Sequence, residues 1–297
     1  MNNEFCKCPY IPCKLRGNCK ACIAKNEIDG TLAHCMEDIA MKHGAVLPLR
    51  LPRTVICNEA ESMSNYCAEL IAKVIMEKPD ALICLPAGES AIGTFKALKD
   101  MSDRKEIDFG QAWFVALDEW LNLEDESENC TAFMFKNFYE PLNIDHSRIK
   151  FFDIHAEDMA EECKRVDQFI FDHNGIDCML LGLGMNGHIG LNEPHSSFDS
   201  YAKVASLDSV TKEIGQKYFS SKVVLTEGIT LGMRHVFEAK QVILQVTGKK
   251  KADIVRKIYE AQPSYALPAT VVKLLSNAVV VLDCDAASEI KELLETE

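Results

Sequence analysis

The chain of 297 residues carries a formal net charge of −13, with 47% hydrophobic and 26% charged residues, which is typical of a globular protein with a substantial core. The acidic balance excludes nucleic acid as the main partner, because a phosphate backbone needs a basic face. No apolar run is long enough to span a bilayer and the N-terminus shows no signal-peptide pattern, so we expect a cytoplasmic protein with no membrane partner.

Cysteines gather at the N-terminus, where six of the thirteen fall within the first 35 residues. In a reducing compartment such a cluster binds metal more often than it forms disulfides. Two short-spaced pairs could place four thiolates around a tetrahedral structural zinc ion. These pairs are Cys8 with Cys13 and Cys19 with Cys22. An iron–sulfur cluster is the second choice, a tail of free thiols is the alternative without metal, and the spare candidate ligands are Cys6, His34 and Cys35.

Two strand–helix units are predicted next. Residues 54–58 predict a strand, and residues 59–77 have the apolar spacing of a helix that packs on a sheet. A buried strand at 81–85 leads through a glycine turn into a helix that begins near Ser90. Such a turn can bind an anion, because free N–H groups and the helix dipole favour negative charge there. The plainer alternative is a helix start that Ser90 caps.

A third strand is predicted at 112–117, and two adjacent acids, Asp118 and Glu119, follow it. Acids at a strand end can serve as a general base or bind substrate, although solvated loop acids are the more common explanation. Beyond them, residues 129–139 and 156–173 predict two further helices.

The stretch 177–194, DCMLLGLGMNGHIGLNEP, is the most informative part of the chain. Its apolar start predicts a buried strand, which glycines end sharply. The polar residues that follow include Asn186, His188 and Glu193. Ligands bind at the carboxyl ends of strands in an open α/β sheet, and an imidazole oriented by a carboxylate is suited to proton transfer. An ordinary loop with an exposed histidine is the alternative.

In the remaining third of the chain, predicted helices again alternate with predicted strands. We expect a polar loop at 194–208, a helix at 209–219, a turn and a helix at 226–240, and strands at 241–246 and 279–282. Between the last two strands, Gly248 precedes three lysines that end at Lys251, which could equally be a solvated helix face.

Strands that alternate with helices, without hairpin signals, predict an α/β fold. We expect a Rossmann-like three-layer α/β/α arrangement with a mostly parallel central sheet. A small Cys-rich, metal-binding module at residues 1–40 precedes this domain, which occupies residues 41–297.

Four separated segments carry a family resemblance. They are KPDALICLPAG at 78–88, FVALDEW at 114–120, LGLGMNGHIGLNEP at 181–194 and LQVTGKKKA at 244–252. In order and spacing they resemble the glucosamine-6-phosphate deaminase family, including its galactosamine-6-phosphate isomerase branch. The resemblance covers about residues 55–285 and implies a small amino-sugar phosphate as substrate and no cofactor for catalysis. A 6-phosphogluconolactonase of the same architecture and a non-catalytic sugar-phosphate sensor are the rival interpretations.

The resemblance also implies roles for individual residues. Asp118 would be the proton-transferring base, His188 would open the sugar ring, Glu193 would orient the imidazole, and Asn186 would hold it by a hydrogen bond. The candidate substrate-binding residues are Gly88, Ser90, Glu119, Lys217 and Lys251. Three positions depart from the usual family pattern: Glu89 and Ala91 stand where a glycine and a proline are usual beside the expected phosphate, and Lys217 stands where many members have an arginine. Neither the sugar epimer nor a homo-oligomeric state follows from the sequence.

Overall fold

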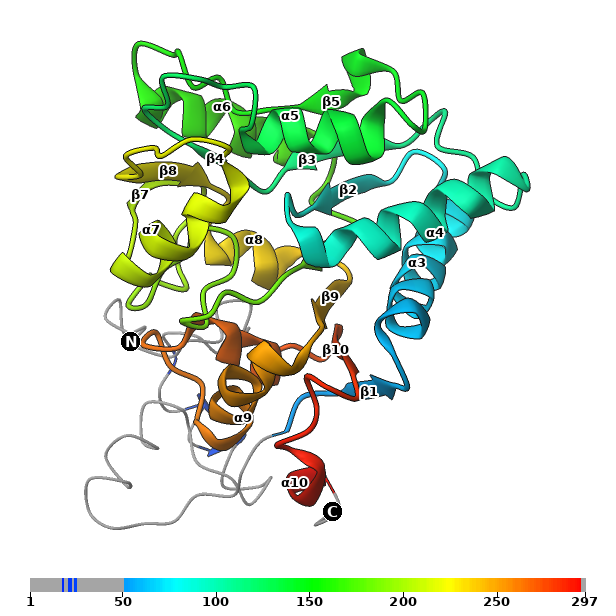
Figure 1. Ribbon diagram of the computed structural model, residues 1–297, viewed down its shortest axis with the longest axis vertical. Helices are drawn as coiled ribbons and strands as arrows, with labels where there is room; N and C mark the ends of the chain where they lie inside the picture. The colour runs from blue at the N-terminus through cyan, green and yellow to red at the C-terminus, as the bar shows by residue number, and fades with distance from the viewer. Residues whose placement is uncertain (1–17, 19–20, 23, 26–50, 295–297) are drawn as a thin grey trace.

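The computed structural model describes residues 18, 21–22, 24–25 and 51–294 (Figure 1). Within those residues, no helix combines the length and the apolar character needed to cross a membrane. The main-domain helices are α3 (Ala60–Glu77), α4 (Ile92–Asp103), α5 (Cys130–Met134), α6 (Met159–Asp172), α7 (Ser209–Gly215), α8 (Met233–Glu238), α9 (Ala252–Glu260) and α10 (Lys291–Leu294). Shorter helical turns are η1 (Glu89–Ala91), the π-helical η2 (Phe135–Tyr139), η3 (His146–Arg148), η4 (Gln216–Tyr218), η5 (Lys249–Lys251) and η6 (Pro268–Leu274).

A seven-stranded sheet forms the centre, in the order β1-β10-β9-β6-β2-β3-β5, and its neighbouring strands pair in parallel. Its strands are β1 (Thr54–Cys57), β2 (Leu82–Leu85), β3 (Trp113–Ala116), β5 (Ile149–Lys150), β6 (Cys178–Leu181), β9 (Val242–Val246) and β10 (Ala278–Asp283). The prediction of a mostly parallel central sheet is therefore confirmed, and the short edge strand β5 is an element that the sequence analysis missed.

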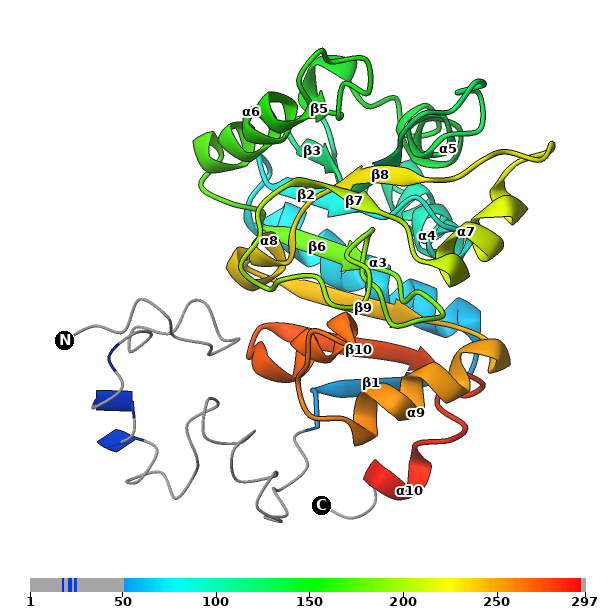
Figure 2. The same ribbon diagram turned by 90° about the vertical axis from the view of Figure 1, so that its left-hand side faces the viewer.

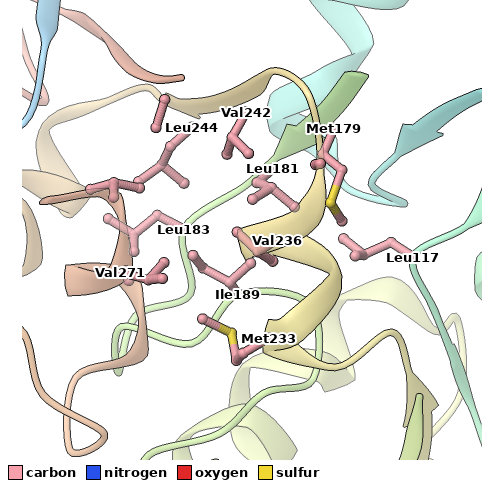
Figure 3. Close-up of a cluster of buried hydrophobic side chains, with 14 of the residues drawn as sticks. Leu117, Met179, Leu181, Leu183, Ile189, Met233, Val236, Val242, Leu244 and Val271 are labelled. Atoms are coloured by element: carbon pink, nitrogen blue, oxygen red, sulfur yellow. The ribbon is translucent and has the colours of Figure 1, made fainter. Parts of the chain in front are cut away.

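Helices cover both faces of this sheet (Figure 2). Alternate side chains of one strand point to opposite faces. Accordingly, Leu82 and Cys84 of β2 join a core with α6, α8 and α9, whereas Ile83 and Leu85 join a second core with α3, α4, α5 and η2. Figure 3 shows part of the first core, where Val236 of α8 lies over the strands. The predicted three-layer arrangement is confirmed.

The connection order creates a topological switch point beside β2. After β2 the chain proceeds outward to β3 and β5, and then returns to β6 on the other side of β2. Connections that diverge in this way leave a crevice at the carboxyl ends of the two strands, where open α/β sheets bind ligands. The loops that follow β2 and β6 therefore meet at the place where a site is expected.

A second, antiparallel sheet corrects two predictions. It consists of β4 (Asp118–Trp120), β8 (Glu227–Thr230) and β7 (Lys203–Ser206), in the order β4-β8-β7. We predicted no strand within 194–208 and a turn at the start of 226–240. Both predictions were wrong, because β7 lies in the first segment and β8 lies at the start of the second. Strand β7 is short and only Ala205 of its four side chains is fully buried, so its extended form depends on pairing with β8 rather than on an apolar pattern of its own.

Candidate active site

The loop after β6 is shaped around the ring of His188. Its turn is closed by hydrogen bonds from Gly184 N to His188 O (3.0 Å) and from Gly187 N to Gly184 O (3.1 Å). Gly187 has φ +83°, a conformation that favours glycine. A Cβ on Gly184 would lie 2.3 Å from His188 Nε2, so the imidazole can occupy this position only because residue 184 has no side chain.

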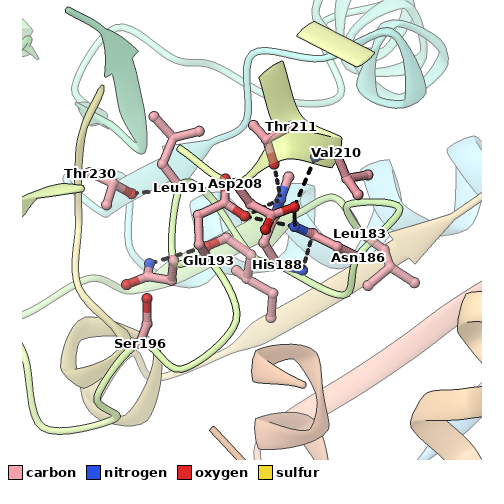
Figure 4. A network of polar contacts seen from close by, with 12 residues as sticks. Leu183, Asn186, His188, Leu191, Glu193, Ser196, Asp208, Val210, Thr211 and Thr230 are labelled. Carbon is pink, nitrogen blue, oxygen red and sulfur yellow. Dashed lines mark hydrogen bonds and ion pairs between the residues drawn. The ribbon is translucent and has the colours of Figure 1, made fainter. Parts of the chain in front are cut away.

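Two side chains hold His188 through the same ring nitrogen (Figure 4). Its Nδ1 lies 3.2 Å from Glu193 Oε2 and 3.0 Å from Thr211 Oγ1. Within residues 51–294, Nδ1 is the ring atom of His188 that forms hydrogen bonds. Nε2 is therefore available to exchange a proton with a substrate. The structure therefore brings His188 and Glu193 together, as the sequence predicted.

Asn186 joins this network from within the same loop. Its Nδ2 donates to Glu193 Oε2 at 2.8 Å and to Asp208 Oδ1 at 3.3 Å, and its Oδ1 accepts from His188 N at 3.2 Å. Burial alone would raise the pKa of Glu193, but hydrogen bonds from His188, Thr211 and Asn186 outweigh burial and lower it. Glu193 is thus kept ionised and can stabilise an imidazolium.

Asp118 reaches the same loop from β4, an edge strand of the antiparallel sheet. It is the first residue of β4, pairs with Thr230 of β8, and is half-buried. A Cβ on Gly190 would lie 3.4 Å from Asp118 Oδ2, so the carboxylate borders the loop two residues from His188. Burial and the neighbouring charge of Glu119 raise the pKa of Asp118 to about 7, against a hydrogen bond from Cys130. A carboxylate with this pKa suits general base catalysis near neutral pH.

Glu119 is bound to other parts of the protein. It lies deeper in the fold than Asp118, although both carboxylates interact with the Cys130 thiol. Glu119 is 1% exposed, and its carboxylate accepts hydrogen bonds from the backbone N–H groups of Trp120, Cys130 and Thr131 and from the Thr131 hydroxyl, at 2.7–2.9 Å. These contacts fasten the start of α5 to β4, and substrate binding by Glu119 stays a prediction.

The remaining predicted substrate-binding residues converge at the carboxyl ends of β2, β6 and β9. Gly88 and Ser90 follow β2, and a Cβ on Gly182 of the β6 loop would lie 3.5 Å from Ser90 Oγ. Gln245 of β9 donates to Ser90 O at 2.9 Å. These contacts place the predicted phosphate loop beside the loop that carries His188.

Two lysines approach this position from other elements. Lys251, in η5, donates from Nζ to Leu183 O. Burial, and next the charge of Lys217, lower the pKa of Lys251 to about 8. Lys217, in η4, also forms a 2.7 Å ion pair with Glu89. Positive charge is thus concentrated at one point of an acidic protein, as an anionic ligand would require.

Thr211 and Asp208 are residues that the sequence analysis missed. Asp208 caps α7, since its Oδ1 accepts from Val210 N at 2.9 Å, and a polar residue before a helix is a recognisable cap signal. Nothing in the local sequence shows that α7 folds back over the loop 182–193, so the contacts with Asn186 and His188 could not be read from it.

The predicted zinc ligands lie mostly beyond the described part of the chain. Cys8, Cys13 and Cys19 lie outside the described residues, and so do Cys6, His34 and Cys35, whereas Cys22 is described. Among the described residues, no three His, Cys, Asp or Glu side chains are grouped so as to hold a metal ion.

Comparisons with known proteins agree with this geometry. The family model described as glucosamine-6-phosphate isomerases/6-phosphogluconolactonase matches residues 58–281. The glucosamine-6-phosphate deaminase of Thermoanaerobacter sp. (strain X514) is 34% identical over 242 residues, which are 81% of this chain and 96% of that protein. The deaminase of Clostridium botulinum (strain Loch Maree / Type A3) is 33% identical over 240 residues, 80% of this chain and 98% of that protein.

Solved structures of similar proteins superpose on this chain. A monomeric glucosamine-6-phosphate deaminase superposes with a TM-score of 0.76 at 32% identity, and the match covers 80% of this chain and 99% of that one. The 6-phosphogluconolactonase from Trypanosoma cruzi superposes with a TM-score of 0.65 at 16% identity, covering 82% of this chain and 98% of that one, so it shares the fold alone.

Proposed function

Because this chain belongs to the glucosamine-6-phosphate isomerase/6-phosphogluconolactonase family, we propose that it converts an amino-sugar 6-phosphate, of the gluco or galacto configuration, into the ketose 6-phosphate and ammonia. The observation that carries this proposal is the placement of Asp118, with a pKa of about 7, against the same loop that presents His188. A deamination by isomerisation needs both groups, since one opens the ring and the other moves a proton between carbons.

Ring opening is assigned to His188. The imidazole moves a proton from the hydroxyl on carbon 1 to the ring oxygen, through the Nε2 that its network leaves available. Glu193 stabilises the imidazolium that forms on the way, while Asn186 and Thr211 fix the ring. The product of this step is the open-chain amino aldehyde.

Proton transfer between carbons is assigned to Asp118. Its carboxylate removes the proton from carbon 2 while the carbonyl oxygen on carbon 1 takes up a proton, which gives an enolamine. The carboxylate then returns its proton to carbon 1, and the amine on carbon 2 releases one proton as it becomes an imine, which balances the proton taken up by the oxygen. Water then adds to carbon 2 and ammonia leaves, which yields the ketose. Atoms balance with one water consumed, and no redox or organic cofactor is required. This pairing of a carboxylate base with an imidazole follows the logic of aldose–ketose isomerases.

Phosphate binding is assigned to Gly88, Ser90, Lys217 and Lys251. Their convergence at the switch point of the sheet supports this role. The backbone around Gly88 supplies N–H donors, and the two ammonium groups supply charge that the protein as a whole lacks.

The test is ammonia release from glucosamine 6-phosphate and galactosamine 6-phosphate, measured side by side with hydrolysis of 6-phosphogluconolactone. The proposal predicts ammonia from at least one amino sugar and no lactone hydrolysis above the uncatalysed rate. Lactone hydrolysis without ammonia release would favour the lactonase interpretation. Binding of a sugar phosphate without any turnover would favour a sensor.

For the N-terminal extension we propose a structural zinc ion bound by Cys8, Cys13, Cys19 and Cys22. The support is their spacing as two short pairs in a chain that is otherwise expected to need no metal. Metal analysis of the purified full-length protein should return about one zinc per chain. A preparation with neither zinc nor iron would refute this proposal.

A further inference from the structure

An ion pair lies inside the group of residues assigned to phosphate. Glu89 Oε2 is 2.7 Å from Lys217 Nζ, and the two residues are 128 positions apart in the chain. Glu89 follows Gly88 directly and precedes Ser90, so its carboxylate belongs to the loop that would hold the phosphate. An acid of the protein is therefore paired with one of the two lysines.

The charges around this pair explain why a carboxylate is tolerated there. Lys217 and Lys251 are close enough for the charge of one to lower the pKa of the other. Two ammonium groups at one site repel each other unless an anion lies between or beside them. Glu89 supplies such an anion and leaves one net positive charge on the three groups.

A bound phosphate changes this balance. A dianionic phosphate added to the three groups would leave a net negative charge, and the phosphate and Glu89 would compete for the same ammonium. With Glu89 turned into solvent, the two lysines and the dianion are neutral together. The side chains of Glu89 and Lys217 are 61% and 45% exposed, so the carboxylate can be hydrated without crossing packed residues, and such exposed pairs are weak.

We propose that Glu89 is the resident counter-anion of Lys217, that the phosphate of the substrate displaces it, and that this exchange sets the affinity of the site for phosphate. The inference rests on the proposed function in assigning the lysines to phosphate. It makes Glu89 a residue that weakens anion binding, in contrast to the lysines and backbone groups around it.

Glu89→Gln is the direct test, with inorganic phosphate as the probe and calorimetry at neutral pH and low salt as the measurement. Removing the competing charge should lower the dissociation constant of phosphate about three- to tenfold, the range expected from one partly screened charge. Glu106→Gln is the matched control, since Glu106 forms an equally exposed pair with Arg104 beyond the opposite end of α4. That variant should bind phosphate as the wild type does.

The role of Lys217 is tested by repeating the substitution in a Lys217→Gln background. Glu89→Gln should then change phosphate affinity less than about twofold, because the two residues act as a pair. Unchanged or weaker phosphate binding in Glu89→Gln would overturn the proposal. An undiminished gain in the Lys217→Gln background would overturn it too, since it would show a general charge effect.

The counter-anion proposal can be tested separately from the proposed reaction, because phosphate binding needs no turnover. If neither amino sugar releases ammonia and Glu89→Gln still tightens phosphate binding, the reaction is wrong and the counter-anion stands. If ammonia is released while Glu89→Gln leaves both phosphate affinity and the KM for the sugar unchanged, the counter-anion alone is wrong.

Discussion

Asp118→Asn should make the folded protein more stable while it abolishes turnover. The Asp118 carboxylate has an ordinary pKa of 3.8 and a pKa of about 7 in the folded chain, with burial as the main cause. Folding at pH 8 therefore moves a charged carboxylate into surroundings that disfavour it. Asparagine has nearly the same shape and no charge, so the variant avoids this cost.

The size of the effect follows from the shift in pKa. About three pKa units correspond to an upper limit of about 4 kcal/mol, and water that reaches the half-buried carboxylate reduces the expected gain to about 1–3 kcal/mol. A gain of this size raises the Tm by about 2–6 °C in a domain of this length. Loss of the base should lower kcat by about a hundredfold or more.

The stability that Asp118→Asn gains over the wild type should depend on pH. With a raised pKa, the folded wild type keeps a proton that the unfolded chain releases, so its stability falls as the pH rises from about 4 to about 7. The advantage of Asp118→Asn should be close to zero below about pH 4, grow through this window, and stay constant above it.

Thermal and urea unfolding across this pH range measure the difference, with Asp100→Asn on the exposed surface of α4 as the control. The control should follow the wild type at each pH. A variant at position 118 that is less stable than the wild type at pH 8, or an advantage that does not change with pH, would refute the reasoning.

The pH profile of the reaction and two substitutions test other parts of the site. The plot of kcat/KM against pH should rise near pH 7, where Asp118 ionises, and fall near pH 8, where Lys251 loses its proton; limbs more than about a unit away would contradict these assignments. Glu119→Ala should cost about 3–5 kcal/mol in urea unfolding, because buried N–H groups lose a charged acceptor, and a cost below about 1 kcal/mol would contradict this structural role. Gly184→Ala should lower kcat about a hundredfold by displacing His188. Gly182→Ala should have a much smaller effect, because its new Cβ makes only a 3.5 Å contact. Equal activities of the two variants would contradict the fit of the ring over Gly184.

The inner strands of the central sheet could be predicted because they are buried on both faces. Parallel strands of this kind appear in a sequence as continuous apolar runs, as in LICL of β2 and CMLL of β6. The antiparallel sheet could not be predicted in the same way. Strand β7 reads KVAS, with one fully buried side chain, and its conformation depends on pairing with β8, which follows more than twenty residues later.

Part of the site could also be predicted from the sequence. Polar residues directly after β3 and β6 could be placed at one edge of the sheet by topology alone, which located Asp118, His188 and Glu193. The contacts of Glu119 could not be predicted because the strand was expected to end at residue 117. In the structure β4 follows, and the Glu119 carboxylate is buried against the start of α5. The contact between Thr211 and His188 depends on how α7 folds back, which no local pattern specifies.

The most direct test of the account is a crystal structure of the Asp118→Asn variant with glucosamine 6-phosphate or galactosamine 6-phosphate bound. The account predicts one hexose with carbon 2 beside residue 118, the ring oxygen beside His188 Nε2, and the phosphate against Ser90 and Lys251. A sugar that contacts His188 while residue 118 faces a separate space, or a phosphate bound away from both lysines, would contradict it.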